Sequence, residues 1–421
     1  MSADHIRGEF VLTPVSPVHI GSGEVLQGID YVLRGREFVV KDVRAFFEAH
    51  RDNPKYALDA VEAGLDIGGE YVRYQLPAFV DQRGGGQPQP RGGPPRKDQP
   101  FLGGGGPRGR KGRRDAQMSK LQRQAEKQFG TSPPPKELPR REQRGAGDVR
   151  EFIKDPFGKV FLPASSFKGS VRTALACYLA EQAPEAFAAA LREVGQQRGG
   201  KYGPNPRRAF EPVNNVLFGK RAHEDLLKAL VIQDSQPLVP EECLLLAQVK
   251  VMNVFRERFT EKRSVPIQAE CLAPGVKGIR LPFHVDGFVL EHDQPLKRLL
   301  KGLGAAVLRQ RESFTKALHA HGAALARYEC DFYADQGQAG PERFFQDIAR
   351  SPEIHLPVGF GTGWHAKTVG RLLRGNDLAK LRGMFRMGHR EADIFPKTRK
   401  WARCKEGELP MGWLRVAIEW K

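Results

Sequence analysis

A long segment with almost nothing to bury divides this chain into two parts that can fold. Residues 82–147 consist largely of Gly, Pro, Gln and Arg, with 16 Lys/Arg against 5 Asp/Glu. Such a composition cannot offset the entropy lost on ordering a backbone, so it predicts a disordered insertion. It is typical of an arm that binds an RNA backbone, and equally of a solvated linker. The packed core must therefore come from the flanking residues.

The balance of charge indicates what kind of partner the chain has. The formal net charge is +18 over 421 residues, and the insertion holds more than half of it. A surplus of this size favours a polyanionic partner, most often nucleic acid. No apolar run of about 18 residues predicts a membrane span, and the first residues do not have the pattern of a signal peptide. The five cysteines lack C-x-x-C spacing, which argues against a zinc ribbon and predicts a reducing, cytoplasmic compartment.

Outside the insertion, the sequence alternates between strand and helix patterns. Runs of alternating apolar residues bounded by Gly and Pro predict strands, and apolar residues three and four apart predict helices, which gives an α+β fold. Asp42 is the expected N-cap of the first helix. We expect strands at residues 9–13, 29–33, 37–40, 230–235, 244–251, 265–272, 281–290 and 413–420, and helices at 42–50, 165–179, 296–303, 305–328 and 367–373.

A glycine-rich loop at residues 358–368 has the composition of a phosphate-binding segment. Gly359, Gly361 and Gly363 permit positive φ and close approach to a ligand, and Lys367 follows with a full positive charge. A nucleotide-binding P-loop is excluded, because its lysine directly follows the last glycine and here three residues intervene. A dinucleotide fingerprint is also absent. A tight β-turn with an incidental lysine is the alternative explanation.

A second candidate segment starts a helix near residue 165. Ser165 or Ser166 is the expected cap, and Lys168 and Arg172, four residues apart, share one helix face. Hydroxyls, unpaired N–H groups and a lysine at a helix N-terminus form an anion site. An ordinary capped helix with two solvated cations would show the same residues.

Three motifs, in this order, resemble the RAMP superfamily of CRISPR effector subunits. The resemblance is greatest to the fifth Csm subunit of type III-A interference complexes, and it covers residues 5–80 and 150–421. Ala164 stands where glycine is usual in the family. The motifs are Pro17-Val-His-Ile-Gly-Ser-Gly23, Leu162-Pro-Ala-Ser-Ser-Phe-Lys-Gly-Ser-Val-Arg-Thr-Ala174, and the late glycine loop followed by Pro396-Lys-Thr-Arg399.

The resemblance implies a fold and a role. It implies two RRM-like (ferredoxin-like) βαββαβ domains, at residues 1–235 with the insertion and at residues 236–421 with the glycine loop. It implies a non-catalytic subunit that caps the 3′ side of the CRISPR guide RNA beside sister subunits and target RNA, in a complex for antiviral defence. Neither cofactor nor metal is expected. The RNA-binding residues expected on this basis are His19, Gly21, Gly23, Ser165, Ser166, Lys168, Arg172, Gly359, Gly361, Gly363, Lys367, Lys397 and Arg399.

Three other functions fit parts of the sequence. Related backbone subunits cut target RNA with a metal-dependent aspartate, and Asp30 occupies a comparable offset, although a lone aspartate there is more often a turn acceptor. A Cas6-like, metal-independent endoribonuclease that processes repeat RNA would need a general base such as His19 or His365, with Lys168 stabilising the phosphate. A general RNA-binding module is a third class, and the aromatic octapeptide of ordinary RRM readers is not visible in the sequence.

Overall fold

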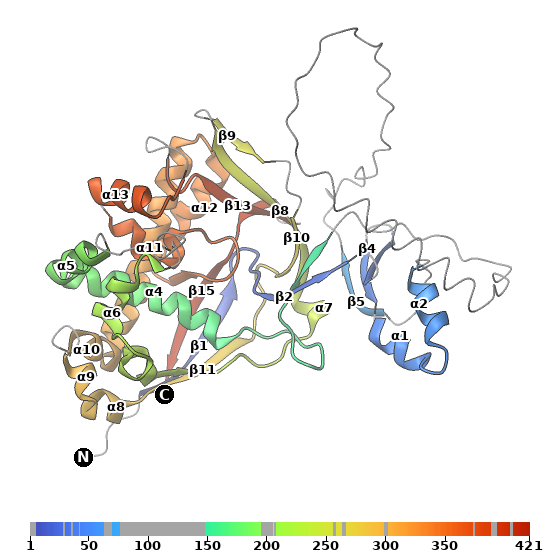
Figure 1. Cartoon of the computed structure of the whole chain (residues 1–421), viewed down its shortest axis with the longest axis horizontal. Helices are drawn as coiled ribbons and strands as arrows, with labels where there is room; N and C mark the ends of the chain where they lie inside the picture. Colours follow the sequence, from blue (N-terminus) through green and yellow to red (C-terminus); the bar gives the residue numbers. More distant parts are fainter. Residues whose placement is uncertain are drawn as a thin grey trace, which may run out of the picture.

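A computed structural model shows the arrangement of the chain (Figure 1). The structure describes residues 6–27, 30–34, 37–41, 43–62, 70–75, 148–194, 205, 208–255, 258–262, 267–298, 302–373, 375–388, 394–404 and 407–421. The predicted insertion at 82–147 and the predicted cap Asp42 lie outside these residues.

A five-stranded antiparallel sheet holds the first and last strands of the described chain at its centre. Strand β1 (Ile6–Pro14) pairs with β11 (Ile279–Val285) on one side and with β15 (Trp413–Trp420) on the other. The edges are β12 (Ile354–Pro357) and β7 (Leu230–Ile232), giving the order β12-β15-β1-β11-β7. Alternate residues of β1 are buried, which is the pattern of a sheet with one face on a core.

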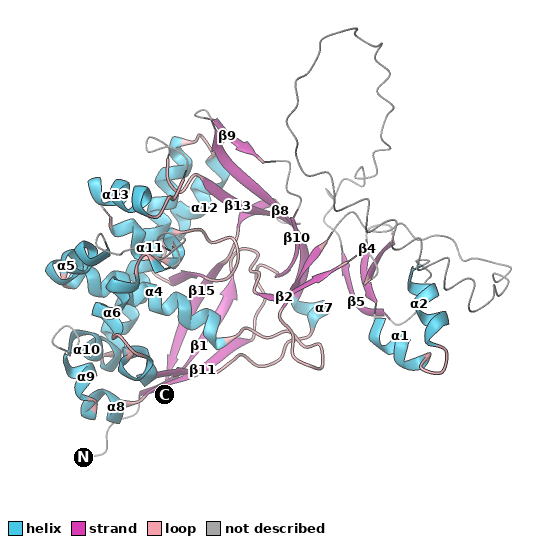
Figure 2. Cartoon of the chain, in the orientation of Figure 1, coloured by secondary structure: helices cyan, strands magenta, loops and turns pink. Residues whose placement is uncertain are grey.

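Two long helices cover the inner face of this sheet. Helix α4 (Ala164–Gln182) and helix α11 (Arg311–Asp335) contact each other as well as β12, and the main hydrophobic core lies between them and the sheet. Figure 2 shows α4 and α11 on one side of the strands together with most of the other helices, whereas α1 (Val43–Ala49), α2 (Pro54–Glu62) and α7 (Pro240–Cys243) lie on the other side. Reading β1, α4, β7, β11, α11 and β15 along the chain gives a βαββαβ succession in which the fourth strand lies beside the first.

A seven-stranded sheet forms the second large layer. Its order is β14-β13-β8-β10-β6-β2, with one further strand, β9, paired to β8. Helix α11 and helix α12 (Ala339–Arg350) pack on one face through an aromatic cluster. Strands β6 and β10 are parallel, and the other pairs are antiparallel. The strands are β2 (Gly21–Leu26), β6 (Val149–Phe152), β8 (Leu244–Phe255), β9 (Arg258–Glu261), β10 (Ile267–Leu272), β13 (Thr398–Cys404) and β14 (Gly407–Pro410).

A third, smaller sheet and several short helices complete the described chain. The sheet has the order β3-β4-β5, and its first two strands, which correspond to those expected at 29–33 and 37–40, pair as a hairpin. Its strands are β3 (Tyr31–Arg34), β4 (Glu37–Lys41) and β5 (Glu70–Gln75). The other helices are α1 (Val43–Ala49), α2 (Pro54–Glu62), α5 (Pro184–Val194), α6 (Glu211–Phe218), α7 (Pro240–Cys243), α8 (Gly287–His292), α9 (Gln294–Arg298), α10 (Leu303–Arg309) and α13 (Asn376–Met384), and the 3₁₀ turns are η2 (Ala222–Glu224), η3 (Leu226–Ala229), η5 (His365–Lys367) and η6 (Val369–Leu372).

The mixed α/β class is confirmed, and several element boundaries differ from the prediction. The strand expected at 281–290 ends at Val285, because Asp286 accepts a hydrogen bond from Val289 N and starts α8. The helix expected at 305–328 is two helices, separated at Gln310. Residues 367–373 form two 3₁₀ turns instead of a helix.

The halves of the chain on either side of residue 235 do not form separate sheets. Strand β1 of the first half lies between β11 and β15 of the second, and β6 of the first half pairs with β10 of the second. The division expected at 235/236 therefore does not separate the layers of the fold. Among the described helices, none is long and apolar enough to cross a membrane.

Candidate functional site

The glycine loop after β12 lies directly on the His19 segment. Phe360 N donates a hydrogen bond of 2.8 Å to His19 O, and Val358 N donates one of 2.7 Å to Gly412 O. Gly359 has a φ of +82°, and a Cβ atom there would lie 2.3 Å from His19 O. The glycine is therefore required both by the backbone angle and by the close approach of two chain segments. Two of the three sequence motifs thus meet at this contact.

The other two glycines of the loop have different surroundings. Gly361, with a φ of +90°, packs on the side chain of Met411, 2.9 Å from where its Cβ would be. Gly363 has the same φ, but a Cβ there would meet nothing within 4 Å. Close packing therefore explains the first two glycines, and only the backbone angle explains the third.

The remaining motif, at the start of α4, faces the glycine loop across a pocket of about 340 Å³, which we call the serine pocket. One wall is a face of α4 made of small and hydroxyl-bearing residues, and the other is the glycine loop. No acidic side chain is among the described residues that line it. These residues are Ser165, Ser166, Gly169, Ser170, Thr173, Pro357, Val358, Gly359, Thr362, Ala366 and Lys367.

The serine pocket offers hydroxyl groups and one ammonium. The Ser170 side chain is only 6% exposed, and its Oγ has no hydrogen-bond partner among the described residues, which is costly unless a ligand or water supplies one. Lys367 is accessible at the mouth, yet the pocket walls remove enough water to lower its pKa. Donors and a cation without a carboxylate are the groups that bind a phosphodiester.

The start of α4 differs from the expected serine cap. The N-cap position is Pro163, and no side chain of its own caps the helix. Instead, Asp234 from the segment after β7 accepts a 2.6 Å hydrogen bond from Ala164 N. The prediction that Ser165 or Ser166 caps the helix was therefore wrong, and both serines line the pocket instead.

Lys168 and Arg172 share a helix face, as their spacing predicted, but that face is not the pocket wall. Lys168 Nζ donates a 2.7 Å hydrogen bond to Leu230 O, and burial lowers its pKa. Arg172 forms an ion pair with Asp225 at 2.8 Å, and its guanidinium lies 4.2 Å from the Phe218 ring centroid. Both cations thus hold α4 to neighbouring segments.

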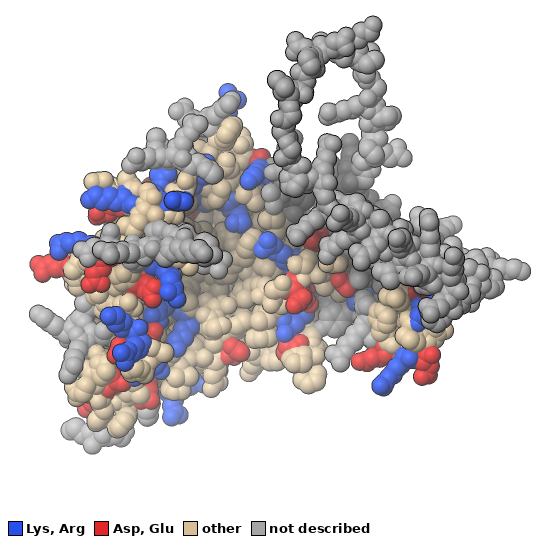
Figure 3. All heavy atoms as spheres, in the orientation of Figure 1, with Lys and Arg blue, Asp and Glu red and all other residues tan. Residues whose placement is uncertain are grey.

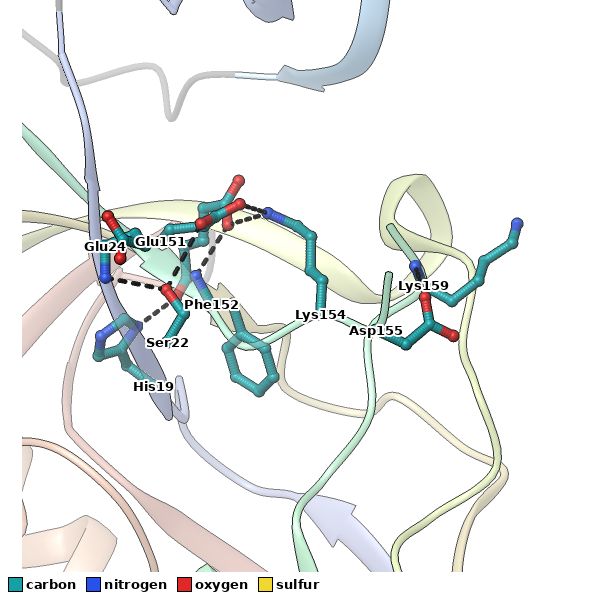
Figure 4. Close-up of polar contacts among 9 residues, drawn as sticks. His19, Ser22, Glu24, Glu151, Phe152, Lys154, Asp155 and Lys159 are labelled. Atoms are coloured by element: carbon teal, nitrogen blue, oxygen red, sulfur yellow. Dashed lines mark hydrogen bonds and ion pairs between the residues drawn. The ribbon is translucent and has the colours of Figure 1, made fainter. Parts of the chain in front are cut away.

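His19 is part of a buried polar network, which Figure 4 shows. Its side chain is 3% exposed, its Nδ1 donates to Glu270 O at 2.7 Å, and burial lowers its pKa. The Glu270 carboxylate is itself fully buried and pairs with Lys154 at 2.7 Å. Gly21 lies close to the His19 ring, whereas Gly23 has open space around it. The histidine therefore supports the start of β2.

Four further candidate residues do not line the serine pocket. Arg399 is 7% exposed, and its Nε lies 2.5 Å from a Glu329 carboxylate oxygen, so it is not available as a surface RNA contact. His365 is 4% exposed, and burial lowers its pKa to about 3. Asp30 accepts a 2.8 Å hydrogen bond from Gln27 N, as a turn aspartate does. The backbone oxygen of Lys397 accepts a hydrogen bond from Val254 N.

Sequence reasoning missed three residues beside the glycine loop. The Phe360 ring lies 4.6 Å from the Arg150 guanidinium carbon and 5.0 Å from Lys400 Nζ. Lys400 neighbours Arg399 in sequence but points to the other face of β13, which strand alternation could have suggested. Nothing in the sequence around Arg150 indicated this position. In the described part of the chain, no group of three His, Cys, Asp or Glu side chains could hold a metal ion.

The sequence is similar to one protein family and to two curated proteins. The profile of the RAMP superfamily matches residues 11–298. Two curated relatives, each named "CRISPR system Cms protein Csm5" and from the CDC 1551 and H37Rv strains of Mycobacterium tuberculosis, are 31% identical over 156 residues. The match spans 32% of this chain and only 38% of the length of each relative.

Solved structures share the fold at lower sequence identity. A chain of the cryo-EM structure of a Csm–crRNA–target RNA ternary complex in a type III-A CRISPR-Cas system aligns with a TM-score of 0.63 and 21% identity, over 97% of this chain and 100% of that one. The crystal structure of T. onnurineus Csm5 aligns with a TM-score of 0.54 and 19% identity, over 96% of this chain and 99% of that one.

Proposed function

The chain belongs to the RAMP superfamily, and from that premise we propose that it is an RNA-binding subunit of a type III-A CRISPR effector complex. In this role it caps the 3′ side of the guide RNA and helps assemble the complex that targets viral RNA. Its partners are the guide RNA, the target RNA and sister Csm subunits. The partial match to Csm5 proteins and the shared fold of a Csm chain from an RNA-bound complex support this assignment.

The serine pocket is the observation that carries the proposal. Two of the family motifs, the start of α4 and the glycine loop, form its walls, and the third supports the loop through the hydrogen bond from Phe360 N to His19 O. The pocket supplies hydroxyl donors and Lys367 to a phosphate and leaves the bases of the RNA free to pair. The βαββαβ succession of the five-stranded sheet supports the RRM-like character of this unit.

The RNA contacts that we propose are a revised subset of the expected ones. Ser165, Ser166, Lys367 and the loop glycines line or shape the pocket. Lys168, Arg172 and Arg399 are engaged by other parts of the chain, and we assign them to stabilising the fold around the site. Gly21, Gly23 and Lys397 stay as predicted contacts.

The surroundings of the candidate catalytic residues favour a binding role over a nuclease. A general base must reach the 2′-hydroxyl of RNA, and the His19 ring is buried with Nδ1 bound to Glu270 O. His365 is buried as well. Incubation of the purified protein with repeat RNA, with and without divalent metal, tests this reasoning. Site-specific cleavage that the His19→Ala variant loses while keeping its RNA affinity would replace our proposal with the Cas6-like one.

A substitution at the pocket tests the proposal directly. We expect Lys367→Gln to weaken binding of a single-stranded repeat RNA and to lower the slope of log affinity against log salt by about 0.7, the contribution of one phosphate contact. Lys316→Gln, which removes an exposed cation from α11, is the matched control and should leave the slope unchanged. An unchanged slope in Lys367→Gln would show that the serine pocket does not contact the RNA backbone. Sequencing the RNA that co-purifies with the complex, from both ends, identifies whether it is a repeat-derived guide.

A further inference from the structure

One face of the seven-stranded sheet carries positive charge alone, and we call it the cationic face. The strand register places Ala402 beside Val249, Ala247 beside Ala269, and Ala269 beside Arg150. Small apolar side chains therefore occupy the middle of this face. In the register of the described strands, its charged side chains are all cations, namely Arg150 on β6, Lys400 on β13 and Arg258 on β9.

The opposite face of the same sheet differs in both charge and covering. Its carboxylates pair with cations of that face, as Glu408 does with Lys250 and Arg403. Helices α11 and α12 pack on its aromatic residues. Figure 3 shows Lys and Arg side chains over β13 and next to β10 on the side of the molecule turned to the viewer. One face is therefore covered by helices and has its charges paired, whereas the cationic face lies beside the glycine loop.

The Phe360 ring holds two of the cations in place. Its backbone is fixed by the hydrogen bond to His19 O, and its ring packs with Met411 on the small apolar residues of the cationic face. Arg150 and Lys400 lie 4.6 and 5.0 Å from the ring centroid, within the range of a cation–π interaction. The loop thus brings two charges that repel each other to one ring.

The positive charges at this ring are not neutralised. Burial lowers the pKa of Lys400, and the nearby charges of Lys367 and Arg150 lower it further. Across the described residues, no acidic side chain forms an ion pair with any of these three cations. A cluster of like charges costs free energy in the unliganded protein. A bound polyanion would remove that cost.

We propose that Arg150, Lys367 and Lys400, with Phe360 as the positioning residue, bind consecutive phosphates of one RNA strand that runs from the serine pocket onto the cationic face. The inference rests on the proposed function and adds the path of the strand to it. One strand suffices, because Arg150 and Lys400 lie at a single ring, Lys367 is close enough to influence the charge of Lys400, and the adjoining pocket holds only about 340 Å³. The exposed Arg258 continues the same face beyond Lys400.

The experiment uses the full chain and a labelled single-stranded repeat RNA, with affinity measured by fluorescence anisotropy over a range of salt. The test variant is Arg150→Gln/Lys400→Gln, and the control is Arg309→Gln/Lys316→Gln, which removes one exposed arginine and one exposed lysine from α10 and α11. We expect the test variant to lower the salt slope by about 1.4, two contacts of about 0.7 each. Between about 50 and about 200 mM salt its affinity should then change about sevenfold less than that of the wild type. The control should keep the wild-type slope.

The Phe360→Leu variant separates positioning from charge. It keeps all three cations, so the slope should stay near the wild-type value while affinity falls about threefold through lost cation–π contacts. Phe288→Leu, at an exposed phenylalanine elsewhere in the fold, is the control for a general loss of an aromatic side chain. Equal affinities of Phe360→Leu and Phe288→Leu would overturn the positioning role.

The outcomes distinguish this inference from the proposed function. A wild-type slope in Arg150→Gln/Lys400→Gln, together with a reduced slope in Lys367→Gln, would overturn the inference and leave the RNA-binding subunit intact. Wild-type slopes in both variants would overturn both. If the double variant loses binding of polyglutamate but keeps its RNA slope, the cationic face docks an acidic protein segment and the RNA path is refuted.

Discussion

Replacing Gly359 by alanine tests the contact that joins the glycine loop to the His19 segment. Alanine at a φ of +82° costs roughly 1–2 kcal/mol of folding free energy, because its Cβ crowds the backbone. In addition, the new Cβ would lie 2.3 Å from His19 O, closer than the 3.0 Å that real Cβ contacts observe. The carbonyl must therefore move, and the 2.8 Å hydrogen bond from Phe360 N lengthens or breaks. The loss of that buried bond adds about 1–2 kcal/mol.

Gly363→Ala is the matched control within the same loop. Its φ of +90° imposes a similar backbone cost, but its Cβ would have no neighbour within 4 Å. We therefore expect Gly359→Ala to lower the free energy of unfolding by about 2–4 kcal/mol and Gly363→Ala by about 1–2 kcal/mol.

Urea unfolding followed by tryptophan fluorescence measures both values, and Trp364 reports from the loop itself. The comparison is valid if the two variants unfold with the same denaturant slope as the wild type. Equal losses of stability in Gly359→Ala and Gly363→Ala would refute the reasoning. The glycine at 359 would then be needed only for its backbone angle, and the approach to His19 would carry no energetic weight.

Two further predictions concern buried charged and titratable groups. Arg399→Gln leaves Glu329 as a buried unpaired charge, so the free energy of unfolding measured by denaturant titration should fall by about 3–5 kcal/mol. The salt slope of RNA binding by the folded variant should equal that of the wild type, and a reduced slope would return Arg399 to the RNA contacts. Burial lowers the pKa of His321 to about 3, below its ordinary 6.5, so the unfolded chain takes up a proton that the native one does not as pH falls from 6.5 toward 3. His321 alone should therefore contribute a loss of about 1.4 kcal/mol of stability per pH unit in that window, and His321→Gln should show a pH dependence that is shallower by this amount. Equal dependences would show that His321 accepts a proton in the folded state.

Local sequence patterns predicted the elements whose burial follows a simple period. The strand at 413–420 alternates cleanly and forms as expected, and the strands expected at 29–33 and 37–40 form as β3 and β4. The order of three motifs also indicated the family, which the profile match confirms. The strand predictions succeeded because each depended on residues that are near one another in the chain, and the family prediction because each motif is itself a short local segment.

The site was harder to predict because its contacts join distant segments. The sequence around Ser165 and Ser166 is that of a helix cap. Their place in the pocket depends on Asp234, some seventy residues later, which accepts the hydrogen bond from Ala164 N that a capping side chain would otherwise accept. The sequence predicted that Lys168 binds phosphate, but in the fold its ammonium group donates a hydrogen bond to Leu230 O. Whether a lysine or arginine binds a ligand or stabilises the fold depends on the group that the fold places beside it.

Two adjacent cations on one strand also show that the sequence alone does not predict the contacts of a side chain. Arg399 and Lys400 are adjacent, yet one pairs with Glu329 in the core and the other lies beside Phe360. Alternation predicts that they face opposite ways but not which of the two faces is covered. That choice depends on where α11 packs.

The central place of β1 in the five-stranded sheet has a consequence for synthesis of the protein. Gly8 pairs with Trp420, so this strand waits for a partner that the ribosome makes roughly 400 residues later. At about 5–20 residues per second, that delay is about 20–80 s. During it the apolar side chains of β1 have no completed sheet to join, and the partly made chain is exposed to aggregation. Production of the intact protein should therefore respond more to chaperone supply and translation speed than its folded stability alone would indicate.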